Sequence, residues 1–203
     1  EILIGLVGSE MCIRDRWPLV EWCLEYCRRQ LTPDGVVASD TDELEGRFPT
    51  GDANLCTSML YYDALLSAVS LGRELGVESA QTARYAAQAR ALARAIDAYF
   101  GGEVGGYDTY RYYAGNTLLR SWICMPLIVG LKERSEGTVR ALLGPELMTD
   151  DGLLTQQGSS TFWDRSTLYA LRGIYNVGQA DRATELLHLS LIHISEPTRP
   201  ISI

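Results

Sequence analysis

The stretch VASDTDELEGRFPTGDANLCTSMLYYDALL, residues 37–66, decides how we interpret this chain. Its first half is a loop of carboxylates and turn residues, and its second half has the apolar spacing of a buried helix. Thr50 or Asp52 is predicted to cap that helix at its start. The apolar positions recur at intervals of three and four residues, at Leu55, Met59, Tyr62, Leu66 and Val69.

The loop holds five carboxylates, which are Asp40, Asp42, Glu43, Glu45 and Asp52. Like charges packed closely raise one another's pKa, so that one carboxyl can stay protonated and serve as a general acid. A run of charges is also typical of a solvated surface loop, and this alternative stays open. Counted from its first aspartate, the loop lacks the glycine and the final glutamate of an EF-hand, which disfavours a calcium site.

The two ends of the chain share an unexpected relationship. Residues 6–16 read LVGSEMCIRDR, and residues 189–199 read LSLIHISEPTR. One DNA segment, translated in its two orientations, encodes both stretches, and it resembles an adapter from a sequencing library. We therefore interpret residues 1–16 and 189–203 as adapter-derived and exclude them from fold reasoning, which leaves residues 17–188 as part of one domain.

The acidic composition of the chain disfavours some classes of binding partner. The chain has a formal net charge of −8 at pH 7. Lys132 is its single lysine. Such a chain is poorly suited to neutralising phosphates, so we expect it to bind neither nucleic acid nor an anionic membrane surface. No run of about 18 apolar residues occurs, so no membrane span is expected.

Cysteine and histidine offer little chemistry between residues 17 and 188. Cys23, Cys27, Cys56 and Cys124 form no Cys-x-x-Cys pair, and His188 is the one histidine of this segment. No metal site is expected, because the ligand spacing of a zinc site is missing. The cysteines are predicted to be buried free thiols. If the protein is an enzyme, carboxylates must carry its catalysis.

The remaining pattern is mostly helical. Residues 101–115 are rich in glycine and tyrosine and predict a β-like excursion, and Pro126 is expected to kink an apolar helix. Short loops alternate with long polar ones, as expected for a ring of helical hairpins whose long loops share one face. The fold class is therefore all-α. Predicted helices cover 17–31, 52–75, 78–100, 118–132, 136–143, 164–178 and residues from 181 onward.

Three blocks of sequence resemble the inverting six-hairpin glycosidases, the class that contains neutral trehalases and processing α-glucosidases. Residues 39–42 (SDTD), Arg47 and residues 52–55 (DANL) are similar to the family's S-G-x-D motif, its arginine and its D-x-N, with Asp40 in place of the glycine. The second block joins the run GGYDTY at 105–110 to MPL at 125–127. The third joins GLLT at 152–155, FWD at 162–164 and the RGI at 172–174.

This resemblance implies an incomplete (α/α)6 toroid, with residues 17–188 as part of a glycosidase catalytic domain. It implies inverting hydrolysis of a carbohydrate by two carboxylates roughly 6.5–9.5 Å apart, without a cofactor. Asp42 is expected to be the general acid, and Asp40 is the alternative. The family's general base is a glutamate on a late loop, so we expect it beyond residue 188 and expect the fragment to be inactive.

The resemblance also suggests residues that bind substrate. An aromatic face can stack on a sugar, and a carboxylate or guanidinium can hydrogen-bond its hydroxyl groups. Three of the candidates have a purely structural alternative, which is core packing for Trp163, helix capping for Asp164 and neutralisation of the acidic loop for Arg47. The substrate-binding candidates are Arg47, Asp52, Asn54, Tyr107, Asp108, Trp163 and Asp164.

Two other classes of function stay open. A lyase or epimerase on the same toroid would use a histidine or tyrosine base, and histidine is scarce here. A non-catalytic helical scaffold would have no need for five carboxylates beside a Trp-Asp pair.

Overall fold

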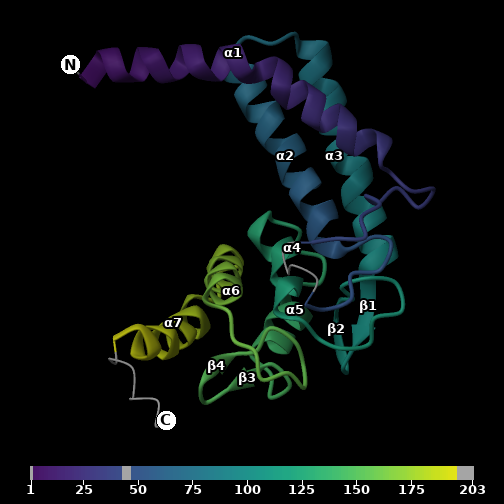
Figure 1. Ribbon diagram of the computed structural model, residues 1–203, viewed down its shortest axis with the longest axis vertical. Helices are drawn as coiled ribbons and strands as arrows, with labels where there is room; N and C mark the ends of the chain where they lie inside the picture. The colour runs from purple at the N-terminus through teal and green to yellow at the C-terminus, as the bar shows by residue number, and fades with distance from the viewer. Residues whose placement is uncertain (1, 43–46, 196–203) are drawn as a thin grey trace.

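A computed structural model of the chain describes residues 2–42 and 47–195. Side chains are described for residues 14–42 and 47–188. Glu43 and Glu45, two of the predicted loop carboxylates, lie outside the described residues. Figure 1 shows the long helices α1, α2 and α3 beside a group of shorter helices and small hairpins.

Helix α1 spans Ile2–Arg29, so the helix predicted over 17–31 ends two residues earlier than expected and begins further toward the N-terminus. Pro18 lies inside this helix. A proline inside a helix removes one backbone hydrogen bond and bends the axis. Figure 1 shows α1 changing direction along its length, with its first part projecting beyond α2 and α3.

Helices α2 (Leu55–Glu74) and α3 (Ser79–Phe100) form the predicted hairpin. Gly76 ends α2 with a φ of 69°, a left-handed conformation that favours glycine. Within the described residues α2 is the helix long and apolar enough to cross a membrane, and half of that apolar window is buried. This burial is typical of a core helix, since the fully buried Leu55, Met59 and Leu65 belong to the hydrophobic core.

The glycine-rich excursion after α3 is an antiparallel hairpin, as predicted. Strand β1 (Gly101–Val104) pairs with β2 (Tyr107–Tyr110), and Gly101 lies opposite Tyr110. Helix α5 (Ser135–Leu142) packs on β2 so closely that a Cβ added at Gly137 would collide with the carbonyl oxygen of Asp108.

The prediction of one long helix over 118–132 is wrong. This segment forms the 3-10 helix η1 (Ser121–Cys124) and the single turn α4 (Met125–Ile128). Pro126 stands in the first turn of α4, where its missing N–H costs little, and does not kink a longer helix. Gly130, with a φ of 83°, turns the chain soon after α4.

The last part of the described chain matches the prediction more closely. Strands β3 (Met148–Thr149) and β4 (Gly152–Leu153) make a small hairpin. Helices α6 (Asp164–Asn176) and α7 (Ala180–Ser195) follow it. Helix α6 approaches the η1–α4 segment closely, because a Cβ at Gly173 would lie 2.9 Å from Leu127 Cβ.

The prediction of buried thiols holds for part of the set. Cys56 and Cys124 are buried, Cys27 is partly buried and Cys23 is exposed. Cys23 lies on the face of α1 that carries the exposed Leu19, Trp22 and Tyr26. The described chain is thus an all-α fold of helical hairpins with one β-hairpin at 101–110, as the sequence predicts. The second small hairpin, β3–β4, lies in a segment predicted to be a loop.

Candidate functional site

The acidic loop is closed by hydrogen bonds between its two ends. The Ser39 N–H donates to the Asp52 carbonyl at 2.8 Å, and Thr50 Oγ1 donates to the Asp40 carbonyl at 2.8 Å. Ser39 Oγ also donates to the Thr41 carbonyl at 2.6 Å. The side chains of Asp40 and Asp52 are exposed. The described parts of the loop, residues 37–42 and 47–54, therefore form a hydrogen-bonded frame that presents two of the predicted carboxylates to solvent.

Asn54 connects this frame to helix α2. Its side chain is fully buried, and its Oδ1 accepts from the Thr57 N–H at 2.8 Å, which makes it the N-cap of α2. Its Nδ2 donates to the Thr41 carbonyl at 3.0 Å. The prediction of Thr50 or Asp52 as the cap is wrong, because α2 begins only at Leu55. The geometry gives Asn54 a role in positioning the loop.

Asp42 is held by a tyrosine from a distant part of the chain. Tyr112 Oη donates to Asp42 Oδ2 at 2.6 Å, and Asp42 is partly buried. Tyr112 is itself buried, and its carbonyl accepts from the Leu55 N–H at 2.8 Å. The carboxyl of Asp42 is therefore fixed relative to the first residue of α2.

Arg120 lies beneath this pair and is a functional candidate that the sequence reasoning missed. It is only 1% exposed, and its Nε donates to Gln156 Oε1 at 2.8 Å. Its guanidinium carbon lies 4.7 Å from the ring centre of Tyr112, 5.5 Å from that of Tyr113 and 5.4 Å from that of Phe48. Burial lowers the pKa of Arg120, while the two tyrosines and Asp42 act in the opposite direction.

Arg47 links the acidic loop to the start of α6. Its guanidinium carbon lies 5.2 Å from the ring centre of Trp163, within the range of a cation–π contact. A cavity of about 390 Å³ is lined on the loop side by Arg47, Asp40 and neighbouring residues. A second cavity of about 410 Å³ is lined by Arg47, Trp163 and Asp164 together with Phe162 and Arg165. Four predicted site residues are thus brought together here.

Asp164 does not cap helix α6, which was one of the two roles that the sequence left open for it. Trp163, and not Asp164, occupies the N-cap position of α6, and no side chain caps the helix there. Asp164 is the exposed first residue of the helix, where a negative charge is favourable. Trp163 is partly buried and packs against the core while one face meets Arg47.

Tyr107 and Asp108 are engaged elsewhere. Tyr107 Oη donates to Glu146 Oε2 at 2.9 Å, and Asp108 forms an ion pair with Arg134. Arg134 also pairs with Asp97 at 2.8 Å. These contacts lie on the side of the hairpin that faces α5, so the structure does not bring Tyr107 and Asp108 to the acidic loop.

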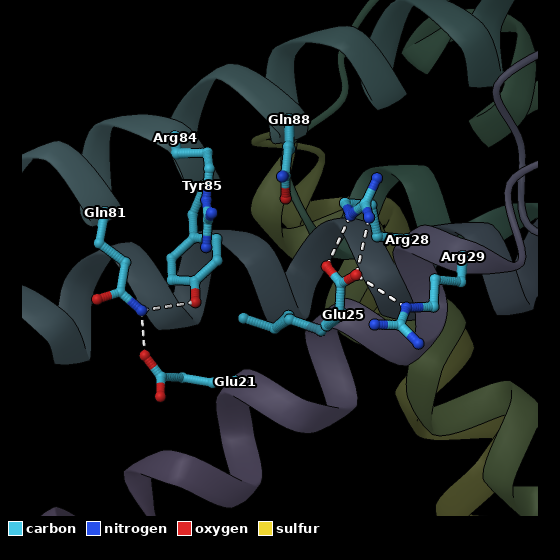
Figure 2. Close-up of a pocket in the computed structure, with 9 residues that line it drawn as sticks. Glu21, Glu25, Arg28, Arg29, Gln81, Arg84, Tyr85 and Gln88 are labelled. Carbon is cyan, nitrogen blue, oxygen red and sulfur yellow. Dashed lines mark hydrogen bonds and ion pairs between the residues drawn. The ribbon is translucent and has the colours of Figure 1, made fainter.

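A wide polar groove of about 670 Å³ between α1 and α3 contains none of the predicted site residues. Figure 2 shows its lining, in which Glu25 pairs with Arg28 and Arg29 at 2.7 and 2.9 Å. Hydrogen bonds from these two arginines lower the pKa of Glu25 to about 2. Glu25, Arg28 and Arg29 pair with one another at the surface, as in a solvated cleft between helices.

The fold and the position of the site define an all-α protein of the helical-hairpin toroid class, with its candidate site on the long loops. Among solved structures, the neutral trehalase Nth1 from Saccharomyces cerevisiae is similar to this chain, with a TM-score of 0.60 and 17% sequence identity. The match covers 76% of this chain and 33% of the trehalase, so the chain spans about a third of that protein's length. No family model and no curated protein sequence matches the chain. At this identity the likeness establishes the fold.

Proposed function

We propose that the protein is an inverting glycoside hydrolase in which Asp42 is the general acid, acting on an oligosaccharide or α-glycoside. The observation that carries this proposal is the Asp42 carboxyl, which Tyr112 holds at 2.6 Å beside the start of α2 in a trehalase-like fold. A general acid must keep one position while the leaving group forms, and this hydrogen bond supplies that constraint.

The reaction uses two carboxyl groups. Asp42 donates its proton to the glycosidic oxygen as the bond from that oxygen to the anomeric carbon breaks. A water attacks the anomeric carbon from the opposite face and gives its proton to a second carboxylate, so the product has the inverted configuration. Asp40 is the alternative acid, and its exposed side chain lies on the same loop.

The second carboxylate belongs, in this proposal, to a part of the protein outside residues 17–188. The solved relative is about three times as long as the region it shares with this chain, which leaves room for such a residue. Without that second carboxylate, residues 17–188 are expected not to hydrolyse a glycoside.

Substrate binding is assigned to the two cavities that share Arg47. Trp163 offers an aromatic face to the C–H surface of a sugar, and Asp164, Asp40 and Arg47 offer hydrogen bonds to its hydroxyl groups. Asp52 has an exposed carboxylate at the end of the loop and remains a candidate. Asn54 supports the loop from below.

The test uses the full-length gene recovered without adapter sequence. The enzyme and its Asp42→Asn variant are assayed against α-glucosides, trehalose and α-rhamnosides, with the anomer of the first product identified by NMR. We expect inversion, and a loss of about 10²–10⁴-fold in kcat in the variant. Asp63→Asn is the matched control, since Asp63 is an exposed aspartate in the middle of α2.

A glycosyl fluoride separates the acid from other roles. Fluoride leaves without a proton from the enzyme, so Asp42→Asn should hydrolyse it at nearly the rate of the unsubstituted enzyme. Full activity of Asp42→Asn on ordinary glycosides would refute the assignment of the acid, and loss in Asp40→Asn instead would move it to Asp40. A folded full-length protein that hydrolyses none of these substrates would favour the non-catalytic scaffold.

A further inference from the structure

The groove between α1 and α3 is separate from the acidic loop and from both cavities that share Arg47. All of the residues that line it belong to these two helices. Its volume of about 670 Å³ falls within the range of about 300–1,000 Å³ that is typical of small-molecule sites. Figure 2 shows Gln81 and Gln88 pointing from α3 toward α1, which carries Glu21 and Glu25. The groove is therefore large enough for a ligand, and polar groups from both helices face it.

The lining changes from apolar to charged between its buried and its exposed residues. Leu24 and Tyr85 are buried and form the floor of the groove. The carboxylates and amides are partly buried, and the arginines at the rim are exposed. These two sets consist of Glu21, Glu25, Gln81 and Gln88, and of Arg28, Arg29 and Arg84. An apolar floor with convergent polar groups around it is typical of a binding pocket.

Hydrogen bonds hold these polar groups in place. Gln81 Nε2 donates to Tyr85 Oη at 3.0 Å and also to the Glu21 carboxylate, so it joins α3 to α1. Glu25 accepts from Arg28 at 2.7 Å. Because these side chains are positioned before a ligand arrives, binding requires less loss of side-chain entropy.

A buried hydroxyl without a partner lies behind the groove. Tyr61, on α2, is 3% exposed, and its hydroxyl has no hydrogen-bond partner among the described residues. Arg28, Glu25 and Tyr85 all act electrostatically on Tyr61, which places this hydroxyl close to the lining. A buried polar group that is unpaired calls for an explanation. A ligand hydroxyl that reaches Tyr61 from the groove supplies the missing hydrogen bond.

The charges of the lining favour one class of ligand. Arg28 and Arg29 are already paired with Glu25, and an anion that passed the rim would meet the carboxylates of Glu25 and Glu21. Exposed arginines are also screened by water and salt. A hydroxyl group both donates and accepts, so it can pair with a carboxylate, an amide or a tyrosine hydroxyl. A neutral ligand with many hydroxyl groups therefore fits the groove better than an anion.

We propose that the groove between α1 and α3 is a second carbohydrate-binding site, which holds a neutral oligosaccharide through Glu21, Gln81 and Gln88. It is distinct from the candidate active site, since its lining includes no residue of the acidic loop, η1 or α6. Its use to the enzyme, which is to keep a long substrate close, rests on the proposed function. The binding itself does not depend on catalysis and can be measured in the 203-residue chain.

The first experiment needs no substituted protein. Maltotetraose and cellotetraose, two neutral oligosaccharides of different linkage, are titrated into the chain while its backbone amide signals are followed by NMR. We expect at least one of them to shift the signals of residues 21–29 and 81–88, and inorganic phosphate to leave them unchanged. No shift with either oligosaccharide would overturn the proposal, as would shifts confined to the acidic loop. A response to phosphate alone would identify an anion site and would overturn it equally.

A substitution on α3 then tests the contact directly. Gln88→Ala should weaken binding of the oligosaccharide about fivefold, the loss expected for a side-chain hydrogen bond. Arg90→Ala is the matched control and should leave the affinity unchanged, because Arg90 is exposed on the same helix and does not line the groove. Alanine is the best helix former, so both variants are expected to keep α3 intact. Unchanged affinity in Gln88→Ala would overturn the proposal.

The full-length enzyme separates this inference from the proposed function. Gln88→Ala should raise KM for a long oligosaccharide about fivefold and leave kcat unchanged, with no effect on a nitrophenyl monosaccharide. If the full-length protein hydrolyses nothing while the groove binds an oligosaccharide, the proposed function fails and the second site stands. If hydrolysis proceeds and the groove binds neither oligosaccharide, the second site fails alone.

Discussion

Asn54 gives the sharpest test of how the acidic loop is attached to the fold. Its buried amide makes two contacts with separate purposes, one to the Thr57 N–H at 2.8 Å and one to the Thr41 carbonyl at 3.0 Å. Asn54→Ala removes both. Asn54→Ser keeps an oxygen that can cap α2 but is too short to reach Thr41.

The magnitudes can be worked from these contacts. Loss of an N-cap costs about 1 kcal/mol, and loss of a neutral side-chain hydrogen bond costs about another 1 kcal/mol. The Thr41 carbonyl also accepts from Ser39 Oγ at 2.6 Å, so it is not left wholly unpaired and the second figure need not rise further. We therefore expect Asn54→Ala to lower the free energy of unfolding by about 2 kcal/mol, and Asn54→Ser by about 1 kcal/mol.

The assay is urea unfolding followed by helical circular dichroism. With a denaturant slope of about 2 kcal/mol/M, Asn54→Ala should lower the urea midpoint by about 1 M, and Asn54→Ser by about half as much. The NMR signal of the Asp42 carboxyl should change in both variants, because both release Thr41. Equal costs for the two variants would refute the separation of roles, and a negligible cost for Asn54→Ala would refute the capping assignment.

Two further predictions concern the framework. Gly137→Ala should lower the free energy of unfolding by about 1–3 kcal/mol, because the new methyl group would collide with the Asp108 carbonyl. Thermal unfolding of this variant and of Glu136→Ala, a control at the surface of the same helix, measures the effect. Burial raises the pKa of Tyr61 from its usual value of 10 to about 12, so its contribution to stability is complete below pH 10 and is lost as the pH rises through about 12. Tyr61→Phe should therefore reduce the loss of stability in that alkaline range, measured as the free energy of unfolding at each pH. At neutral pH the free energy of unfolding should not fall, because the Tyr61 hydroxyl has no hydrogen-bond partner among the described residues. A steeper alkaline loss in Tyr61→Phe would contradict the sign.

The elements that periodicity predicts well are those with a clear polar face or a clear stop. Helix α3 keeps its predicted bounds within one residue, and Gly76 ends α2 where expected. The hairpin at 101–110 follows from its two pairs of glycines and its tyrosines, which favour strands. The prediction of a helix over 118–132 failed because an apolar run without a polar face carries no helical period. Residues 119–128 are all buried, and they form short turns.

The cap of α2 shows a different limit. Three residues that can cap a helix, Thr50, Asp52 and Asn54, stand at alternate positions before the apolar run. Local propensity does not choose among them. The choice is made by the Leu55 N–H, which donates to the Tyr112 carbonyl and so fixes where the helix starts. A contact across the chain, invisible to local pattern, decides the local structure.

Arg120 was missed for a related reason. In the sequence it is one arginine before an apolar run, which suggests the exposed side of a helix. A weak signal exists, since Tyr112 and Tyr113 stand shortly before it and aromatic rings are suitable partners for a buried guanidinium. Only the pairing of Arg120 with Gln156, through both backbone and side chain, brings the arginine under the loop.

The site therefore depends on the connectors more than on the helices. The Leu55 N–H bonds to Tyr112, the Ser121 N–H to Thr155 and the Gln157 N–H to Leu119, so three separate loops are joined by backbone bonds outside the regular elements. Such bonds fix the loops to one another without any contribution from side-chain identity. Such a frame tolerates substitution of many surrounding side chains, and the fold resembles that of a trehalase at 17% sequence identity.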